Sequence, residues 1–120
     1  MKKYQLIIMA VLFWSASSCV QKSYKKTIVI KLIVNHIKDI KTVGIRGNGK
    51  PLSWDKDFAL KPLVKDSLYT VTAAVLTGYK FAEIKFTVNG EFELKKRPSR
   101  RLVFSNKDTT YYNAVFNLEQ

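Results

Sequence analysis

Apolar and polar residues alternate along most of the chain after residue 26, with the period of two that is typical of β-strands. These stretches are rich in β-branched and aromatic residues, and Gly, Asn, Asp or Pro separates them. No stretch has the period of an amphipathic helix. The pattern predicts about seven strands. They cover residues 27–35, 42–46, 67–75, 102–104 and 110–117, and the two arms of a hairpin within 81–94.

The turn signals between these strands recur at the spacing of an antiparallel β-sandwich, and no internal repeat interrupts them. About 100 residues can bury a single core without disulfides. We therefore expect an all-β protein whose sandwich domain covers residues 27–120. Residues 50–60 (KPLSWDKDFAL) are expected to form an irregular loop that carries Trp54.

The strongest local signal is Asn89-Gly90, a pair that favours a two-residue type I′ turn because both positions need a positive φ. Such a turn fixes the register of the hairpin, so that Thr87 faces Phe92. Side chains alternate between the two faces of a strand. The predicted core face consists of Ile84, Phe86 and Val88. The predicted outer face consists of Lys85, Thr87, Phe92 and Leu94.

This register has a difficulty, because it also turns Glu91 and Glu93 toward the core side of the sheet. Two arrangements would remove the conflict. A β-bulge would shift the register and turn both carboxylates to water. Alternatively, the tip of the hairpin projects beyond the core.

Residues 1–18 have the organisation of an export signal. Lys2 and Lys3 form a charged start, Tyr4–Trp14 is an apolar segment, and residues 15–18 (SASS) are small. The apolar segment is shorter than the roughly 20 residues that a transmembrane helix needs. We therefore expect a cleaved signal peptide.

Cys19, the single cysteine of the chain, follows the small residues directly. This arrangement resembles a bacterial lipoprotein signal, which implies that Cys19 is acylated and anchors the protein to a membrane of the cell envelope. Ala16 and Ser18 also suit ordinary signal-peptidase cleavage, which would leave Cys19 as a free thiol. The sequence does not decide between a periplasmic and a surface location.

Basic residues dominate the charge, with 21 Lys and Arg against 9 Asp and Glu and a net charge of +12 at pH 7. Export argues against a nucleic-acid partner. Residues 19–26 are expected to form a lipidated tether, in which Lys22, Lys25 and Lys26 either face anionic headgroups or belong to a solvated spacer. A second basic cluster is expected to be solvated or to face an anionic envelope polymer; it comprises Lys95, Lys96, Arg97, Arg100 and Arg101.

Catalytic and metal-binding patterns were not found in the sequence. His36 is the single histidine, and the domain offers no cysteine to complete a metal site with it. Gly47–Lys50 lacks the spacing of a phosphate-binding loop. We therefore expect a protein that is not an enzyme and that uses no cofactor or metal ion.

Three segments together resemble the starch-binding and glycogen-binding carbohydrate modules, especially those of AMP-activated kinase β subunits and α-glucan branching enzymes. They are Ile45–Leu60 (IRGNGKPLSWDKDFAL), Tyr69–Val71, and Ile84–Phe92 (IKFTVNGEF). The resemblance extends over roughly residues 28–104. It implies an immunoglobulin-like sandwich that binds an α-glucan without catalysis.

The resemblance also implies which residues contact the glycan. Trp54 matches the first sugar-stacking Trp, and Lys85 matches a Lys that bonds sugar hydroxyls. Phe92 stands where the family has a second stacking Trp. Ser99 and Arg100 follow Pro98, where the family has an Asn after the hairpin.

Each of these residues also has a simpler interpretation. Trp54 would instead plug the underside of its loop, Phe92 would pack with Leu94, and Lys85 would be an ordinary solvated side chain. We expect non-catalytic α-glucan binding by an envelope lipoprotein. The alternative is a structural or protein-interaction lipoprotein with a degenerate sugar site. Exposure of Trp54 beside Phe92 and Lys85 distinguishes these hypotheses.

Overall fold

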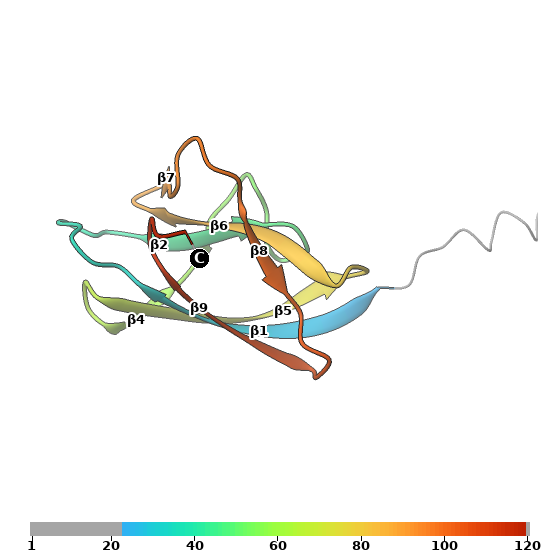
Figure 1. The fold of residues 1–120 in the computed structure, drawn as a ribbon. Coiled ribbons are helices and arrows are strands. Elements are labelled where there is room, and N and C mark those ends of the chain that lie inside the picture. The colour runs from blue at the N-terminus through green and yellow to red at the C-terminus, as the bar shows by residue number, and fades with distance from the viewer. Residues whose placement is uncertain (1–22, 120) are drawn as a thin grey trace, which may run out of the picture.

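The computed structural model describes residues 23–119, and this part of the chain is all-β, with two sheets packed as a sandwich (Figure 1). The predicted fold class is confirmed. The signal peptide, Cys19 and Lys22 lie outside the described residues. The strands are β1 (Tyr24–Ile33), β2 (Val43–Gly47), β3 (Phe58–Ala59), β4 (Lys61–Val64), β5 (Leu68–Thr77), β6 (Phe81–Val88), β7 (Glu91–Phe92), β8 (Arg100–Val103) and β9 (Thr109–Val115).

The first sheet has the strand order β4-β5-β1-β9. β1 and β5 pair antiparallel from Tyr24–Thr77 to Ile33–Leu68. β9 lies on the other side of β1 and runs parallel to it, from Thr27–Thr109 to Ile33–Val115. The expectation of an antiparallel sandwich is therefore correct for the other strand pairs and wrong for this one. The chain can form a parallel pair here because it passes through the second sheet between β1 and β9.

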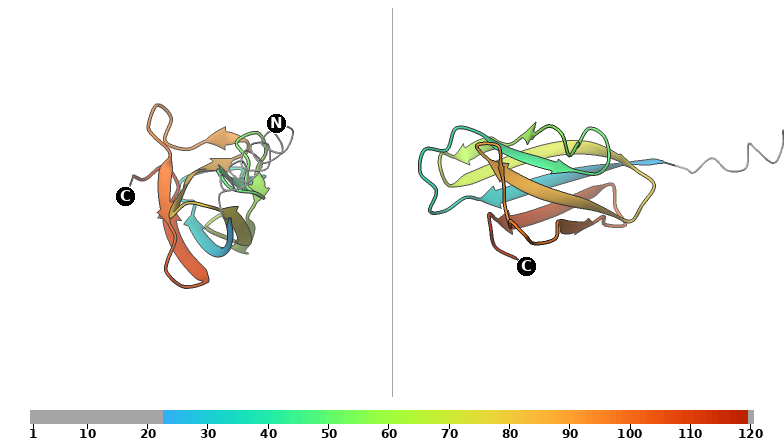
Figure 2. Two further views of the ribbon diagram at one scale, coloured as in Figure 1. Left: turned by 90° about the vertical axis from the view of Figure 1, so that its right-hand side faces the viewer. Right: turned by 90° about the horizontal axis from the view of Figure 1, so that it is seen from above.

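The second sheet has the order β3-β2-β6-β7, and β8 also pairs with β6. β7 pairs with the end of β6 at Thr87 and Val88, whereas β8 pairs with its beginning, from Phe81 to Ile84. The segment between β7 and β8 leaves the sheet and returns to it, and it forms the orange loop at the top of Figure 1 and of the left-hand view in Figure 2.

The core lies between the sheets and is built from every second residue of the long strands. The predicted core face of β6 is confirmed, since Ile84, Phe86 and Val88 are buried. Ile28, Ile30, Leu32 of β1 and Val43 and Ile45 of β2 are buried with them. Burial of each such side chain contributes about 1.5–3 kcal/mol.

β1 begins three residues earlier than predicted. Lys25 and Lys26 pair with Leu76 and Val75 of β5, so they belong to the folded sheet and not to the predicted tether. The hydrophobic pattern could not indicate this extension, because polar residues occupy it. Backbone pairing with the long strand β5 stabilises it instead.

Residues 50–60 were predicted to be irregular, but their end forms β3, and β4 follows at once. β3 pairs with only Gly44 and Ile45 of β2. β4 contains Pro62, and its side chains are exposed. Such short edge strands carry little hydrophobic periodicity, and proline is compatible with an edge position. This accounts for nine strands where about seven were expected.

The predicted turn at the hairpin tip is confirmed, with φ values of 53° at Asn89 and 81° at Gly90. The side chain of Asn89 also ties this tip to the β1–β2 connection. Its Oδ1 accepts hydrogen bonds from the amides of Lys41 (2.7 Å) and Thr42 (3.1 Å), and its Nδ2 donates to the carbonyl oxygen of Asp39 (3.0 Å).

We predict that Asn89→Ala lowers the free energy of unfolding by about 2 kcal/mol. The substitution removes three hydrogen bonds, each with a modest net value, and forces alanine into a left-handed conformation. Urea denaturation followed by Trp54 fluorescence measures the effect. Asn113→Ala, on an exposed position of β9, is the matched control and should change stability by less than about 0.5 kcal/mol. Equal destabilisation by the two variants would contradict the role assigned to Asn89.

Candidate functional site

The outer face of the second sheet brings together most of the residues that the sequence singled out. Arg46 of β2 pairs with Lys85 of β6, and Thr87 of β6 pairs with Phe92 of β7. Gly44, beside Thr87 in β2, completes the same row. Paired residues lie on the same face of a sheet, so these side chains share the face opposite to the core.

Trp54 reaches this face from the loop between β2 and β3. It is 39% exposed. Its indole Nε1 donates to Oδ1 of Asn48 (2.7 Å), and its carbonyl oxygen accepts from Nη1 of Arg46 (3.1 Å). The ring is therefore held in one orientation with part of its surface open to solvent.

Arg46 connects the loop to the hairpin, and the sequence analysis did not identify it. Its Nε bonds Oδ1 of Asp57 at 2.8 Å, and its guanidinium carbon lies 4.9 Å from the centre of the Phe92 ring. This is within the range of a cation–π contact. No local sequence signal pointed to it, because its contacts depend on the pairing of β2 with β6 and on the loop after β2. We refer to Arg46, Asn48, Trp54, Asp57 and Phe92 as the outer-face cluster.

Gly44 makes the close approach of Asp57 to the sheet possible. A Cβ at this position would lie 2.7 Å from Cβ of Asp57 and 2.9 Å from Oγ1 of Thr87. Both distances are shorter than real Cβ contacts. Thr87 is buried although it lies on the outer face. The loop therefore covers this part of the sheet.

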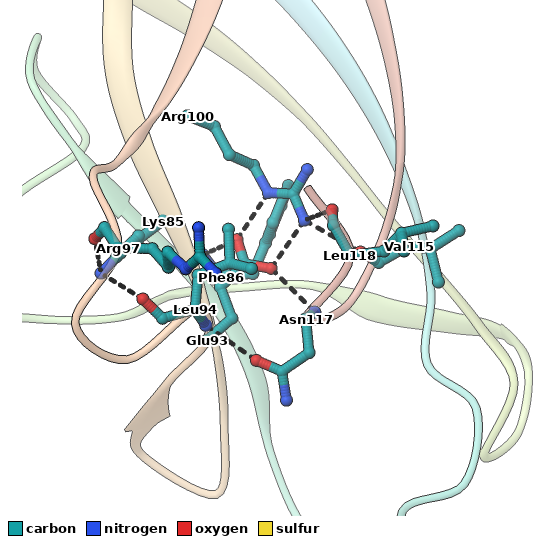
Figure 3. Close-up of polar contacts among 9 residues, drawn as sticks. All are labelled: Lys85, Phe86, Glu93, Leu94, Arg97, Arg100, Val115, Asn117 and Leu118. Atoms are coloured by element: carbon teal, nitrogen blue, oxygen red, sulfur yellow. Dashed lines mark hydrogen bonds and ion pairs between the residues drawn. The ribbon is translucent and has the colours of Figure 1, made fainter. Parts of the chain in front are cut away.

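Lys85, for which the sequence suggested a sugar contact or a solvated position, makes two hydrogen bonds within the protein. Its Nζ donates to the carbonyl oxygens of Leu94 (3.2 Å) and Arg97 (3.0 Å). The ammonium group therefore holds the loop between β7 and β8 (Figure 3). It is an internal contact of the outer face and not a side chain that extends into solvent.

Phe92 has the predicted register without a bulge, since Thr87–Phe92 and Val88–Glu91 are the pairs. The two acids of the hairpin differ. Glu91 is exposed, with Lys95 Nζ at 3.8 Å, whereas Glu93 is fully buried. The proposed bulge is therefore wrong, and Glu93 does enter the protein interior.

Arg100 neutralises this buried carboxylate. Its Nε and Nη2 contact Oε2 and Oε1 of Glu93 at 2.7 and 2.8 Å (Figure 3). Glu93 also accepts from the backbone amides of Phe86 (3.0 Å) and Asn117 (3.1 Å). Arg100 Nη2 donates further to the carbonyl oxygens of Val115 and Leu118. The pair thus joins the hairpin to the beginning of β8 and to the end of the chain.

The expectation that Arg100 is solvated is therefore wrong, because only 7% of the residue is exposed. Burial alone would lower the pKa of Arg100, but its hydrogen bond and charge interaction with Glu93, together with Tyr112, outweigh burial and raise the pKa above its usual value. Ser99, the other residue suggested after Pro98, donates to Oε2 of Glu83 (2.6 Å). Both residues use these groups for internal contacts, whereas Lys95, Lys96, Arg97 and Arg101 are exposed as expected.

Phe92 also borders a groove of about 560 Å³ near the hairpin tip. Ile37, Phe116, Glu91 and Lys95 contribute to its walls. This groove has the volume of a small-ligand site. It extends the surface beside the outer-face cluster toward the end of the sandwich.

Other chemistry is limited in the part of the chain that the structure describes. His36 is exposed in the β1–β2 loop, and residues 23–119 contain no group of three side chains suited to hold a metal ion. The same residues include no helix long and apolar enough to cross a membrane.

Comparison with known proteins gives no assignment. No protein-family model matches the chain, and no curated protein matches it. The carbohydrate-module resemblance is therefore a hypothesis that the geometry of the outer face must support by itself.

We predict that Glu93→Gln lowers the free energy of unfolding by about 3–5 kcal/mol, because it leaves the charge of Arg100 buried without its partner. Chemical denaturation measures the loss. Glu91→Gln, two residues away and exposed, should change stability by less than about 0.5 kcal/mol.

The double variant Glu93→Leu/Arg100→Met tests the same pair as a unit. Removing both charges should restore much of the stability lost in Glu93→Gln, since apolar residues can replace a buried ion pair. If Glu93→Gln were as stable as the wild type, the pair would not organise the hairpin.

Proposed function

We propose that this protein is an envelope lipoprotein that binds an α-glucan-type glycan without catalysis. The observation that supports the proposal best concerns Trp54: its indole is partly exposed and bonded to Asn48, and its backbone carbonyl oxygen accepts from Arg46, whose guanidinium lies over the Phe92 ring. A pyranose ring presents a flat C–H face that stacks well on an aromatic ring. Polar side chains around such a platform then orient the hydroxyl groups.

The proposed roles differ in part from those that the resemblance implies. Trp54 supplies the stacking platform. Asn48 uses Oδ1 to hold the indole, which leaves its amide nitrogen as a donor for a hydroxyl group. Lys85 and Arg46 are the cations of this face, and both also make internal contacts, Lys85 with the loop and Arg46 with Asp57 and the Trp54 carbonyl oxygen. Their remaining N–H groups are the donors proposed for sugar hydroxyl groups. Phe92 offers ring area beside the guanidinium that lies over it.

The membrane anchor is part of this proposal and rests on the sequence. Acylation of Cys19 would place the attachment four residues before Ser23, where the described chain begins. Several acyl chains on one residue give stable attachment, whereas a single chain binds only marginally. The sandwich would then be displayed close to the membrane surface.

A second candidate function is a structural or protein-interaction role for the same lipoprotein. Two contacts favour it: Lys85 holds carbonyl oxygens of the loop, and Arg46 covers part of Phe92. Both contacts stabilise the sheet with side chains that a glycan site would present to its ligand. In this interpretation Trp54 belongs to a protein interface.

We predict that glycogen or amylopectin in a native gel retards the wild-type domain and that Trp54→Ala abolishes the retardation. Loss of the aromatic platform should weaken binding at least about tenfold, whereas Trp54→Phe should retain part of it. Tyr111→Ala, an exposed aromatic residue of the first sheet, is the matched control.

Three outcomes of this gel experiment lead away from the glycan proposal. Absence of retardation on either polymer would favour the interaction role. Unchanged retardation of Trp54→Ala would exclude this face as the site. Binding that weakens steeply with added salt would indicate an anionic polymer instead of stacking.

We predict that cells expressing the full chain incorporate labelled palmitate into the protein and that Cys19→Ser removes the label. The wild type should fractionate with membranes. Ordinary signal-peptidase cleavage predicts the opposite result, an unlabelled wild-type protein that is released in soluble form.

A further inference from the structure

Exposed aromatic and aliphatic side chains gather at the end of the sandwich where the described chain begins. Tyr24 is 59% exposed, Tyr79 68% and Val103 64%. Tyr24 starts β1, Tyr79 lies in the β5–β6 turn, and Val103 ends β8. Figure 1 shows these segments at the end of the sandwich where β1 begins.

Two concavities lie at this end, and Gly78 and Tyr79 border both. The larger, of about 610 Å³, lies between Tyr24, Val103 and the β8–β9 turn. The smaller, of about 420 Å³, is lined by Leu76 and Phe81, among others. Tyr79 thus projects between two partly apolar hollows.

Lysines surround these side chains. Lys25, Lys26 and Lys80 line the larger hollow, and Lys107 stands in the β8–β9 turn. Asp108 is the acidic residue among those that line it. Nζ of Lys26 donates to the carbonyl oxygens of Ser105 (3.3 Å) and Lys107 (3.4 Å), which holds the turn against β1. These lysines therefore belong to the folded sandwich and not to the N-terminal tether.

We infer that this end of the sandwich docks against an anionic phospholipid bilayer. Tyrosine is favoured at the headgroup level of a membrane, where its ring contacts apolar groups and its hydroxyl contacts water. Lysines extend toward lipid phosphates while their stems lie along apolar surface. We refer to Tyr24, Lys25, Tyr79, Lys80 and Val103 as the membrane-facing end.

The short distance between Cys19 and the first strand indicates that a bilayer is the partner of this end. This step rests on the proposed acylation of Cys19. Ser23 follows Cys19 by four positions, a distance of at most about 14 Å in an extended chain. An acylated Cys19 would therefore hold this end near the lipid headgroups, whatever else the protein binds.

The arrangement would also orient the proposed glycan site. β1 has ten residues and extends for about 33 Å away from the membrane-facing end. The Asn89-Gly90 tip and the groove beside Phe92 lie at the opposite end of the sandwich (Figure 1). Asn48, which holds the Trp54 indole, also lines the smaller hollow, so the Trp54 platform lies next to the membrane-facing end and not at the distal tip.

Vesicle binding by a chain without acyl groups tests the inference. Residues 23–119 contain both sheets and the described core, so a chain that starts at residue 19 with Cys19→Ser keeps every strand. We expect it to float with vesicles of equal parts phosphatidylglycerol and phosphatidylethanolamine and not with phosphatidylcholine vesicles. Lys25→Gln/Lys80→Gln should weaken binding about 25-fold, because each lysine near an anionic surface contributes about fivefold. Lys38→Gln/Lys65→Gln, at the opposite end, is the matched control and should have a smaller effect.

A second measurement locates the contact itself. Tyr79→Trp in a Trp54→Phe background should be quenched by brominated phospholipid, whereas Tyr111→Trp in the same background should not. Equal binding to both kinds of vesicle, equal loss in the control pair, or quenching at residue 111 alone would overturn the inference. Absence of vesicle binding would also overturn it. The glycan gel needs no lipid, so it can succeed or fail independently of this result.

Discussion

The buried ion pair between Glu93 and Arg100 is the contact on which the hairpin side of this sandwich depends. Among the described residues, these two are the charged side chains that lie in the interior. Each carboxylate oxygen accepts from the guanidinium and from one backbone amide, so the pair orders parts of β6, β8 and the C-terminal segment together. A buried pair costs desolvation free energy, and its geometry is therefore tightly specified.

The outer face of the same sheet depends on this internal arrangement. With Glu93 turned inward, Phe92 lies outward beside Arg46, and the following loop presents its carbonyl oxygens to Lys85. The cations of this face therefore have structural partners, while Trp54 keeps part of its ring open to solvent. A face with a partly exposed aromatic ring and few free charges is suited to bind through apolar contact. This is the strongest argument for the structural or protein-interaction role.

The hairpin could be predicted from the sequence, because the pair Asn89-Gly90 favours a two-residue turn and such a turn fixes the register of the two strands. The core face of β6 followed from the same register. The partners of Glu93 and Lys85 could not be predicted, since a buried ion pair and a pair of solvated charges look alike in a sequence. β3 and β4 were missed because edge strands need little periodicity, and the parallel β1–β9 pair depends on a path between sheets that local patterns do not encode.

The parallel pairing of β1 with β9 has a mechanical consequence. A force that pulls the start of β1 away from the end of β9 acts along both strands, and the seven residue pairs from Thr27–Thr109 to Ile33–Val115 carry it simultaneously. Shear of this kind must break many hydrogen bonds at once, whereas a hairpin pulled at its open end separates one bond at a time. The domain is thus built to resist tension between its first and last strands.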